Sequence, residues 1–545
     1  MQLADVVDFE TRGHRYVLVV EKGALVEIDP VAGSVVDFLR AEGPVVDWEI
    51  AAALSGRFST SQLTETLEEM TDMGILLTGA QPGNAAGVTP AAALDAASNA
   101  VSDTALDAAL DTALDTALDT ALDTALDTAL DTALDTALDT ALDAALDTAL
   151  DAASVAASGA ASGGSPLLTL PLQTLVLNIS HDCNLRCRYC YAGGGNYGGS
   201  REMMSPKVAR QAVDFLFKES GSRKELQITF FGGEPLLNLP ALKETVEYAR
   251  RAGAGLGKAV EFSLTTNGTL LSDEVTDFLV AANIGVSVSM DGPPEIHDHW
   301  RPVQGGGGSY AVLYPKVKRL LEQRGKRPVG ARVTLARGLG DLGEILKHLL
   351  GLGFHEVGFA PVTSCHPEVA LSQEENGRLL AAFEGLAEEY VHKALRGEYL
   401  GFSNLSNLLG EIHSGDLRSY PCGAGIGFLS VSPVGELFLC HRFTEHREQH
   451  MGNVVSGISP QARTRLLEEG YLGRKEECRG CGIRYFCAGG CYYEAQVRQG
   501  DWRRPNSHYC DWQKRWLEIG LKSYVTIMEN NPDFFLRLFG RRAAC

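Results

Sequence analysis

The sequence has 545 residues, 45% of them hydrophobic, and a formal net charge of −21 at pH 7. This length allows two or three domains with hydrophobic cores. No stretch approaches the roughly 18 uninterrupted apolar residues of a membrane helix, and the acidic start from Met1 to Glu10 is unlike a secretory signal. We therefore expect a cytoplasmic protein with no membrane partner.

The negative charge is concentrated in the first part of the chain. Residues 1–80 carry a net −9 and residues 81–165 a net −14, which leaves +2 for the remaining 380 residues. Because no basic stripe or basic amphipathic helix is visible, we expect no nucleic-acid partner. In a reducing cytoplasm, twelve cysteines, ten of them in tight clusters, favour metal ligands or catalytic thiols over disulfides.

Residues 1–80 are predicted to form a small α/β domain. Two apolar segments, His14 to Val20 and Ala24 to Ile28, flank the turn Glu21-Lys22-Gly23, which is typical of a hairpin. Helical spacing then follows in three segments, Val31 to Leu39, Trp48 to Leu54 and Thr60 to Met73. This order suits a winged-helix shape, but its negative charge would repel DNA. Its exposed hairpin edge could instead add an extended peptide as a further strand, and an accessory domain without a partner is the alternative.

Residues 81–165 are predicted to be an acidic tether. From Ala105 to Asp151 the sequence repeats Ala-Leu-Asp-Thr, with an occasional Ala in place of Thr. A period of four overshoots the 3.6-residue helical turn, so the leucines drift around a helix and form no fixed packing face. Aspartates at i and i+4 also repel one another, with no lysine to relieve them. We expect a solvated segment, partly helical at best.

Strand and helix patterns alternate after Pro166, and residues 166–400 are predicted to form a partial (β/α)6 barrel. The first helix has a clear start, with Ser205 as N-cap and Pro206 in its first turn. Parallel sheets of this kind place reactive groups at the C-terminal ends of their strands. Six apolar segments are the strand candidates: Leu175 to Ile179, Leu226 to Phe231, Glu261 to Thr265, Ile284 to Met290, Ala331 to Leu335 and Glu356 to Phe359.

Three cysteines follow the first strand, in the segment Cys183-Asn-Leu-Arg-Cys187-Arg-Tyr-Cys190. Thiolates with this spacing can surround a cubane cluster, where they hold three irons and leave the fourth iron open. A structural zinc site normally has four protein ligands, and no fourth candidate stands nearby in the sequence. The spacing therefore favours an iron-sulfur cluster, with structural zinc or inert buried thiols as alternatives.

This CxxxCxxC motif, on the loop after the first strand of a β/α series, resembles the radical S-adenosylmethionine (SAM) superfamily. Phe231-Gly-Gly-Glu-Pro235 is similar to the GGEP motif of that family, whose backbone contacts the amino group of SAM. Thr265-Thr-Asn-Gly268 and Ser289-Met-Asp-Gly292 resemble further SAM-contacting segments, although Asn-Gly and Asp-Gly are also ordinary turn formers. The likeness implies SAM-binding positions at Gly232, Gly233, Glu234, Asn267, Ser289, Asp291 and Arg301.

The resemblance also implies a chemistry. The open iron chelates SAM, and one electron, supplied by a reductant such as flavodoxin or ferredoxin, cleaves SAM into methionine and a 5′-deoxyadenosyl radical. That radical removes a hydrogen atom from an unactivated carbon, while the barrel positions the target and excludes water. The catalytic acids and bases stay unassigned, because one sequence cannot rank the many carboxylates at the barrel mouth.

Besides Cys545, residues 401–545 contain seven cysteines, and this segment resembles the SPASM extension of radical SAM enzymes. Their order is Cys422-x12-Gly435-x4-Cys440, then Cys478-x2-Cys481-x5-Cys487-x3-Cys491, then Cys510. In that family two auxiliary clusters interleave, so the resemblance implies three 4Fe-4S clusters in all. One auxiliary cluster would be held by Cys478, Cys481, Cys487 and Cys510, and the other by Cys422, Cys440 and Cys491. A zinc ribbon formed within the middle group is the alternative.

The set Cys422, Cys440 and Cys491 lacks a fourth cysteine, because Gly423-Ala-Gly425 stands where fully ligated relatives place one. The likeness therefore implies an auxiliary cluster with one free iron, which a substrate cysteine thiolate could bind close to the carbon radical. His441, Cys365 or another group could fill that position instead. Cys365 and Cys545 fall outside the three sets and are expected to be structural or incidental.

The chain outside the tether resembles radical SAM peptide maturases. Local likeness is greatest to the SCIFF (ranthipeptide) thioether maturases and the quinohemoprotein amine dehydrogenase maturation proteins, in Tyr191 to Gly199, Ile228 to Leu237, and Cys422 to Arg442 with Met451-Gly-Asn-Val454. This implies thioether cross-links, from cysteine sulfur to carbon, in a ribosomally made precursor whose leader binds residues 1–80. Carbon-carbon cross-linking and formylglycine formation are competing activities. A non-catalytic iron-sulfur electron carrier or scaffold is the alternative from another class.

Overall fold

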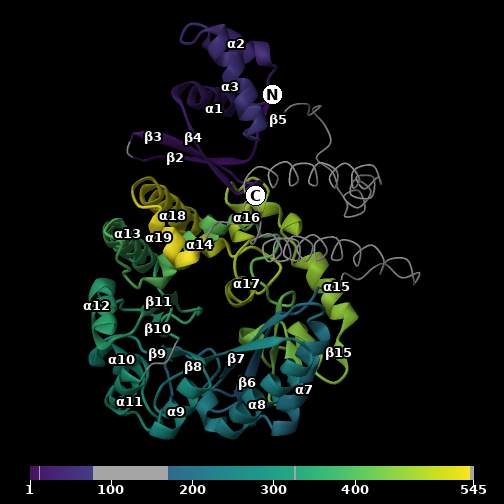
Figure 1. Ribbon diagram of the computed structural model, residues 1–545, viewed down its shortest axis with the longest axis vertical. Coiled ribbons are helices and arrows are strands. Elements are labelled where there is room, and N and C mark those ends of the chain that lie inside the picture. The colour runs from purple at the N-terminus through teal and green to yellow at the C-terminus, as the bar shows by residue number, and fades with distance from the viewer. Residues whose placement is uncertain (12, 78–169, 324–326, 541–545) are drawn as a thin grey trace, which may run out of the picture. The chain divides into compact units, whose positions relative to one another are not determined.

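The computed structural model describes residues 1–11, 13–77, 170–323 and 327–540 (Figure 1). The predicted tether, residues 81–165, and Cys545 lie outside the described residues. Within these ranges, no helix has both the length and the apolar composition needed to cross a membrane.

Residues 1–77 form an α/β domain with the predicted hairpin. Strands β2 (Val6–Thr11), β3 (His14–Val19) and β4 (Ala24–Ile28) make an antiparallel sheet with β3 in the middle. A second, two-stranded sheet joins β1 (Gln2–Leu3) and β5 (Leu76–Leu77). The hairpin prediction is confirmed, whereas β2 was not predicted, because it buries only Phe9 and so lacks a regular alternation.

Three helices follow in this domain, as predicted: α1 (Pro30–Glu42), α2 (Asp47–Leu54) and α3 (Thr60–Asp72). The side chain of Asp29 caps α1 by accepting a hydrogen bond from the backbone N–H of Ala32 at 2.8 Å. Ser59 and Gln62 form a capping box at the start of α3. The helices bury their apolar faces against β3, and the fully buried residues include Val17, Val19, Val35, Val36, Ile50, Leu63 and Met70.

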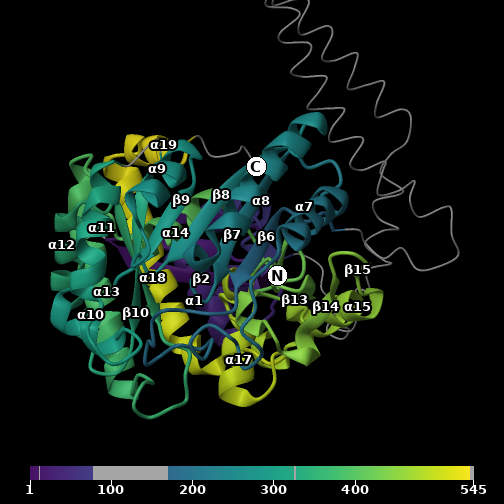
Figure 2. The same cartoon turned by 90° about the horizontal axis from the view of Figure 1, so that it is seen from below.

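Six parallel strands form the wall of a partial barrel, which confirms the predicted β/α series (Figures 1 and 2). They are β6 (Thr174–Ser180), β7 (Glu225–Gly232), β8 (Ala259–Thr266), β9 (Gly285–Ser289), β10 (Val329–Leu335) and β11 (Glu356–Pro361). They pair in chain order, β6 with β7 and so on to β11. Their C-terminal ends therefore lie along one edge, and the loops that leave this edge carry the sequence motifs.

The sheet continues into the segment that was predicted as a separate SPASM extension. Strand β12 (Phe428–Val431) pairs in parallel with β6, although the two are more than two hundred residues apart in sequence. Strands β13 (Glu436–Phe438), β14 (His450–Asn453) and β15 (Gly457–Ile458) then add antiparallel, which gives a sheet of ten strands among the described residues. Residues after 400 thus extend the barrel wall and place Cys440 directly beyond β13.

Helices cover the outer face of the parallel sheet (Figure 2). They are α7 (Pro206–Glu219), α8 (Leu239–Gly255), α9 (Asp273–Ala281), α10 (Pro294–Trp300), α11 (Tyr310–Glu322) and α12 (Leu342–Leu352). The predicted start of α7 is confirmed, since the side chain of Ser205 accepts a hydrogen bond from the backbone N–H of Val208. Each helix presents apolar residues to the sheet, as Ala212, Phe215 and Leu216 do in α7.

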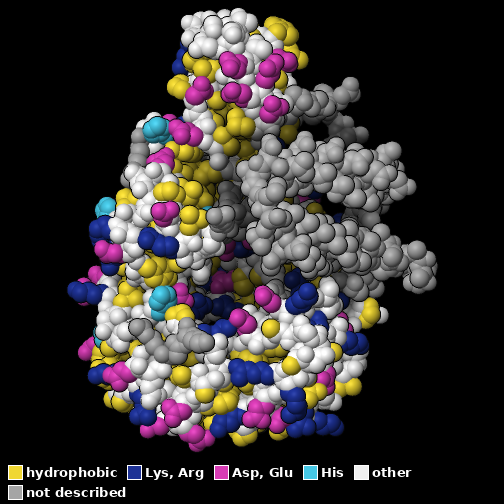
Figure 3. Space-filling model, viewed as in Figure 1, with side chains coloured by type: hydrophobic (Ala, Val, Ile, Leu, Met, Phe, Trp, Pro, Cys, Tyr) yellow, Lys and Arg dark blue, Asp and Glu magenta, His cyan; other side chains and the backbone are white. Residues whose placement is uncertain are grey.

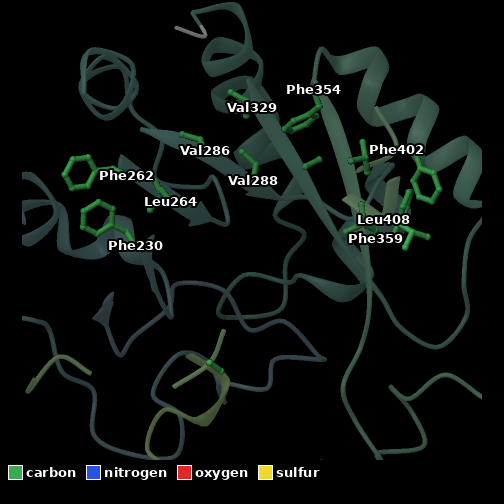
Figure 4. Close-up of a cluster of buried hydrophobic side chains, with 14 of the residues drawn as sticks. Phe230, Phe262, Leu264, Val286, Val288, Val329, Phe354, Phe359, Phe402 and Leu408 are labelled. Carbon is green, nitrogen blue, oxygen red and sulfur yellow. The ribbon is translucent and has the colours of Figure 1, made fainter. Parts of the chain in front are cut away.

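The other α-helices of the described residues follow β11. They are α13 (Gln373–Leu395), α14 (Ser403–Ser414), α15 (Pro460–Glu469), α16 (Arg484–Cys487), α17 (Tyr492–Gln499), α18 (Cys510–Asn530) and α19 (Asp533–Phe539). Figure 4 shows the core, in which Phe230 and Phe262 lie side by side on neighbouring strands, with ring centres 6.1 Å apart. Phe359 of β11 packs on Phe402, just before α14, at 6.1 Å. Close packing of this kind holds the strand ends in place.

Candidate active site

The first cysteine loop follows β6 and holds three partly buried thiols close together. Burial raises the pKa of Cys183 to about 12 and that of Cys187 to about 11, and the charge of Cys190 adds to both shifts. The side-chain amide of Asn267 donates to the sulfur of Cys183 at 3.7 Å. Buried thiolates need a compensating cation, so this donor set fits a metal cluster. No group of three His, Cys, Asp or Glu side chains among the described residues could hold a single metal ion, whereas a cubane spreads its thiolates over separate irons.

Buried polar side chains fix this loop to the barrel. Arg301 donates two hydrogen bonds to Asp291, at 2.9 and 3.0 Å, and its guanidinium lies 5.3 Å from the ring centre of Tyr189. The Tyr189 hydroxyl donates to the same carboxylate, as does the backbone N–H of Thr334 at 2.9 Å. Asp291 is 1% exposed. Its carboxylate therefore anchors the chain between Cys187 and Cys190.

The end of β7 lies against the start of the cysteine loop. A Cβ on Gly232, which has φ +132°, would lie 2.3 Å from the carbonyl oxygen of Ser180, and one on Gly233 would lie 2.1 Å from that of Asp182. These glycines allow a close approach, but the approach seen here is to the protein's own backbone. The motif predicted a backbone contact with SAM at these glycines, and no sequence pattern indicated that they also pack against the cysteine loop.

Glu234 joins the ends of β7 and β8. Its carboxylate accepts hydrogen bonds from the backbone N–H of Asn267 at 2.8 Å and from the hydroxyl of Thr266 at 2.8 Å. It also accepts one from the backbone N–H of Leu236 at 3.0 Å. Burial raises the pKa of Glu234 to about 7, although these hydrogen bonds act in the opposite direction. The residue therefore sets the spacing of the two strand ends.

A cavity of about 510 Å³ lies at the C-terminal ends of the strands. Figure 3 shows a hollow in the face of the molecule, with basic side chains visible inside it. The cavity is lined by the three cysteines of the first loop and by Gly232, Gly233, Glu234, Asn267, Ser289 and Arg301. Six of the seven positions expected to contact SAM thus line the same cavity as the three cysteines. The seventh, Asp291, is buried and does not line it.

The cavity is also lined by residues that sequence reasoning did not single out, notably Arg442 and Arg332 of β10, which pairs with Ser289 of β9. The Arg442 guanidinium lies 5.6 Å from the ring centre of Tyr191 and 5.7 Å from that of Tyr493. It also donates to the hydroxyl of Thr363 at 2.6 Å. Tyr191 follows Cys190 and Arg442 lies two residues after Cys440, so this contact connects the first cysteine loop to the second set of cysteines.

The seven C-terminal cysteines fall into two spatial groups. Cys440 lies close enough to Cys422 and Cys491 for both to raise the pKa of its thiol, which burial brings to about 12. Cys478 is influenced in the same way by Cys481, Cys487 and Cys510, and burial raises the pKa of its thiol to about 11. These are the two sets expected from the resemblance. All the described cysteines are free thiols.

A side chain at position 425 would require neighbouring leucines to move. Gly425 has φ +74°, and a Cβ there would lie 2.2 Å from a methyl carbon of Leu466 and 2.6 Å from one of Leu439. The segment that follows Cys422 thus adds no fourth thiol to Cys440 and Cys491. Of the other candidates for a fourth ligand, His441 lines the cavity, whereas Cys365 is exposed and its thiol lies 3.5 Å from the backbone oxygen of Val497.

Residues 177–357 match the sequence model of the Radical SAM superfamily. The chain is 24% identical over 373 residues to a serine-type anaerobic sulfatase-maturating enzyme of Bacteroides thetaiotaomicron, which covers 62% of this chain and 87% of that protein. It is 21% identical over 366 residues to the radical SAM cyclopropyl synthase TigE of Paramaledivibacter caminithermalis, covering 63% of this chain and 72% of that protein.

The fold resembles the solved structure of anSMEcpe with bound AdoMet and Cp18Cys peptide. The TM-score is 0.55 at 22% sequence identity, over 66% of this chain and 99% of that chain. Residues 177–357 of the β/α barrel, which include the three-cysteine loop, are thus a Radical SAM domain, and such a domain implies a 4Fe-4S cluster and SAM as cofactors. The protein that carries this domain is an enzyme.

Proposed function

We propose that this enzyme forms thioether bonds, from a cysteine sulfur to a carbon atom, in a ribosomally made precursor peptide. The observation that carries the proposal is the group of Cys422, Cys440 and Cys491. Arg442, two residues after Cys440, lines the cavity at the strand ends, which we call the SAM cavity, and contacts Tyr191 of the first cysteine loop. Three thiols without a fourth would leave one iron of a cluster free for the substrate's thiolate. The free iron would lie beside the cavity in which a substrate carbon would lose its hydrogen atom.

Three 4Fe-4S clusters fit the three groups of cysteines. Cys183, Cys187 and Cys190 would hold the first, and the two C-terminal groups would hold the auxiliary clusters of a SPASM extension. When bound, the first cluster and SAM supply a 5′-deoxyadenosyl radical that removes hydrogen from carbon. Electrons released on forming a thioether could leave through the auxiliary clusters, and a flavodoxin or ferredoxin would serve as reductant.

The protein's own residues would position the reactants and exclude water. Asn267, Ser289 and Arg301 face the cavity with hydrogen-bonding groups suited to SAM, and the backbone at Gly233 lies beside them. Phe231 packs against His441 with ring centres 4.7 Å apart, and Tyr191 packs edge-on against Tyr493 at 6.0 Å. This aromatic wall would keep bulk water from the reacting carbon.

Residues 1–77 would bind the leader of the precursor as a winged-helix-like recognition domain. The sheet order β2-β3-β4 leaves one unpaired edge on β2 and one on β4 among the described strands. An extended leader could add there as a fourth strand, with backbone hydrogen bonds supplying affinity. Relatives that act on proteins, such as the sulfatase-maturating enzyme, make a polypeptide substrate the natural expectation.

The test is co-expression with a short cysteine-containing peptide encoded beside the gene, followed by mass spectrometry. A thioether removes two hydrogens and blocks alkylation of the cysteine that forms it. Replacing Cys183, Cys187 and Cys190 by Ala should abolish both the modification and the cleavage of SAM to 5′-deoxyadenosine. A peptide that loses two hydrogens yet alkylates at every cysteine would contradict thioether formation.

Two other activities would be recognised in the same experiment. A carbon-carbon cross-link also removes two hydrogens but leaves every cysteine open to alkylation. Formylglycine formation, which the likeness to sulfatase-maturating enzymes favours, leaves an aldehyde that reacts with a hydrazide probe. A non-catalytic electron carrier would release no 5′-deoxyadenosine at all.

A further inference from the structure

Arg332 differs from the other arginines of the SAM cavity, because no described residue forms an ion pair or hydrogen bond with its guanidinium. Arg301 is paired with Asp291, and Arg442 donates to Thr363 and lies 3.8 Å from Glu494. Glu356 attracts Arg332 only from beyond ion-pair distance. A cation is therefore presented to the cavity without a counter-ion from the protein.

The sheet places this guanidinium at a defined point. Ala331 and Val333 are buried, so the intervening Arg332 faces the opposite side of β10 and lines the cavity. Arg332 lies opposite Gly358 of β11, and a Cβ on Gly358 would lie 2.9 Å from both Nη1 of Arg332 and the hydroxyl oxygen of Ser403. The missing side chain at Gly358 thus provides the space in which the guanidinium lies, beside a hydroxyl.

The surroundings favour an anion at this point. The side chain of Arg332 is exposed and lines the cavity, so a ligand can reach its guanidinium. Desolvation by the surrounding protein and the positive charge of Arg442 both lower the pKa of Arg332, against the attraction of Glu356. A guanidinium stays charged under such conditions. A carboxylate that meets it can form two parallel hydrogen bonds, with the hydroxyl of Ser403 as a further donor.

We propose that Arg332 binds a carboxylate of the peptide substrate, an Asp or Glu side chain close to the residue that is modified. The proposal rests on the proposed function, because it requires a peptide in this cavity. SAM is the other source of a carboxylate, and the experiments below distinguish the two. The substrate is favoured because Arg332 lies beside Gly358 of β11, next to Ser403, and is close enough to Arg442, two residues after Cys440, for the two charges to repel each other.

The first test measures peptide and SAM kinetics separately. The probe is the cysteine-containing peptide encoded beside the gene, made in full and in versions with each Asp or Glu replaced by Asn or Gln. We expect Arg332→Gln to raise KM for the peptide by about 10–100-fold, the usual range for a lost charged hydrogen bond. One peptide substitution should cause the same loss in the wild type and no further loss in Arg332→Gln.

Controls separate binding from folding. Arg332→Lys keeps the charge and should recover part of the peptide affinity. Arg210→Gln, which removes a half-exposed arginine paired with Glu244 on the outer helices, should change nothing. SAM cleavage without peptide, and KM for SAM, should stay the same in Arg332→Gln. A rise in KM for SAM in Arg332→Gln would assign the carboxylate to SAM and overturn the proposal. The proposal would also be overturned if every Asp or Glu substitution in the peptide raised KM by the same factor in Arg332→Gln as in the wild type.

A second measurement needs no turnover. Phenylglyoxal should modify Arg332 in the cluster-loaded full chain, and the acidic peptide should protect it, as read by peptide mapping. SAM alone should give no protection. Because protection and KM report peptide binding whichever bond is formed, the outcome is independent of whether the product is a thioether. Equal protection by the acidic peptide and by its Asn or Gln version would contradict the proposal.

Discussion

Asp291 and Arg301 form a buried two-point ion pair directly behind the first cysteine loop, with side chains 1% and 7% exposed. The carboxylate also accepts hydrogen bonds from Tyr189 and Thr334, so it connects the loop to the end of β10. A buried charge that loses its partner is strongly destabilising, typically by about 3–5 kcal/mol. The pair therefore couples the stability of the barrel to the geometry of the loop.

Asp291→Asn should lower the free energy of unfolding by about 3–5 kcal/mol, because it leaves the charge of Arg301 uncompensated. Denaturant unfolding followed by circular dichroism would measure this. The iron content of the first site should fall as well, since Tyr189 lies between two of its cysteines. Glu344→Gln is the matched control, because its pair with Lys347 is exposed and spans 3.8 Å, and it should have almost no effect. Equal unfolding midpoints for the two variants would contradict the anchoring role.

Gly233→Ala should destabilise the protein by about 1–3 kcal/mol through overpacking. Its Cβ would lie 2.1 Å from the oxygen of Asp182 and 2.8 Å from the Cα of Gly195, and backbone atoms cannot rotate away. We expect a raised KM for SAM in addition, measured as uncoupled formation of 5′-deoxyadenosine. Gly255→Ala, in α8 with no atom within 4 Å of the new Cβ, should instead stabilise by about 0.5–1 kcal/mol.

The barrel strands were visible in the sequence because their apolar residues form a run, as in β6, or alternate with polar residues, as in β8. Strand β12 was not, since it has four residues and its partner β6 is distant in sequence. Short strands that depend on a remote partner carry little local signal. The extension of the sheet past β6 therefore became apparent only in the structure.

Only part of the cavity lining could be predicted from the sequence. Cysteine spacing and glycine motifs are local patterns, and they identified most of one wall. Asp291 belongs to a familiar turn motif, yet its partner Tyr189 comes from the first cysteine loop and its partner Thr334 from β10, so its anchoring role depends on tertiary contacts. Arg332 could have been noticed in the sequence, because it is a charged residue at the centre of the mostly apolar strand β10.

The two C-terminal cysteine groups should bind iron independently of each other. A chain with three 4Fe-4S clusters holds about twelve irons, and loss of one cluster leaves about eight. We expect Cys440→Ala and Cys478→Ala each to show this drop after anaerobic reconstitution. Cys365→Ala should retain all the iron, because its exposed thiol lies outside both groups. A full complement of iron in Cys440→Ala would contradict the proposed ligand set.

The domain formed by residues 1–77 should lose stability in acid through Asp8. Burial raises the pKa of Asp8, but hydrogen bonds from Arg15 and Arg40 outweigh it, so the net shift is downward. A carboxylate with a lowered pKa stabilises the folded state above its unfolded pKa of about 4, and this contribution is lost as pH falls further. Arg15 also bonds Asp37, whose pKa it lowers, although Asp37 is largely exposed and contributes less.

Arg15→Gln should therefore weaken this domain by about 1–2 kcal/mol at pH 7, within the usual range for charged hydrogen bonds. It should also reduce the pH dependence of its stability between pH 5 and pH 3, because Arg40 alone would then lower the pKa of Asp8. Hydrogen exchange of the full chain, corrected for the intrinsic effect of pH, would measure protection in β2, β3 and α1. Peptides of α8 serve as the internal reference. His14→Gln, which breaks an exposed pair with Glu27, should leave protection unchanged at pH 7. If Arg15→Gln and the wild type lost protection in parallel on acidification, the stabilising role of Asp8 would have to be abandoned.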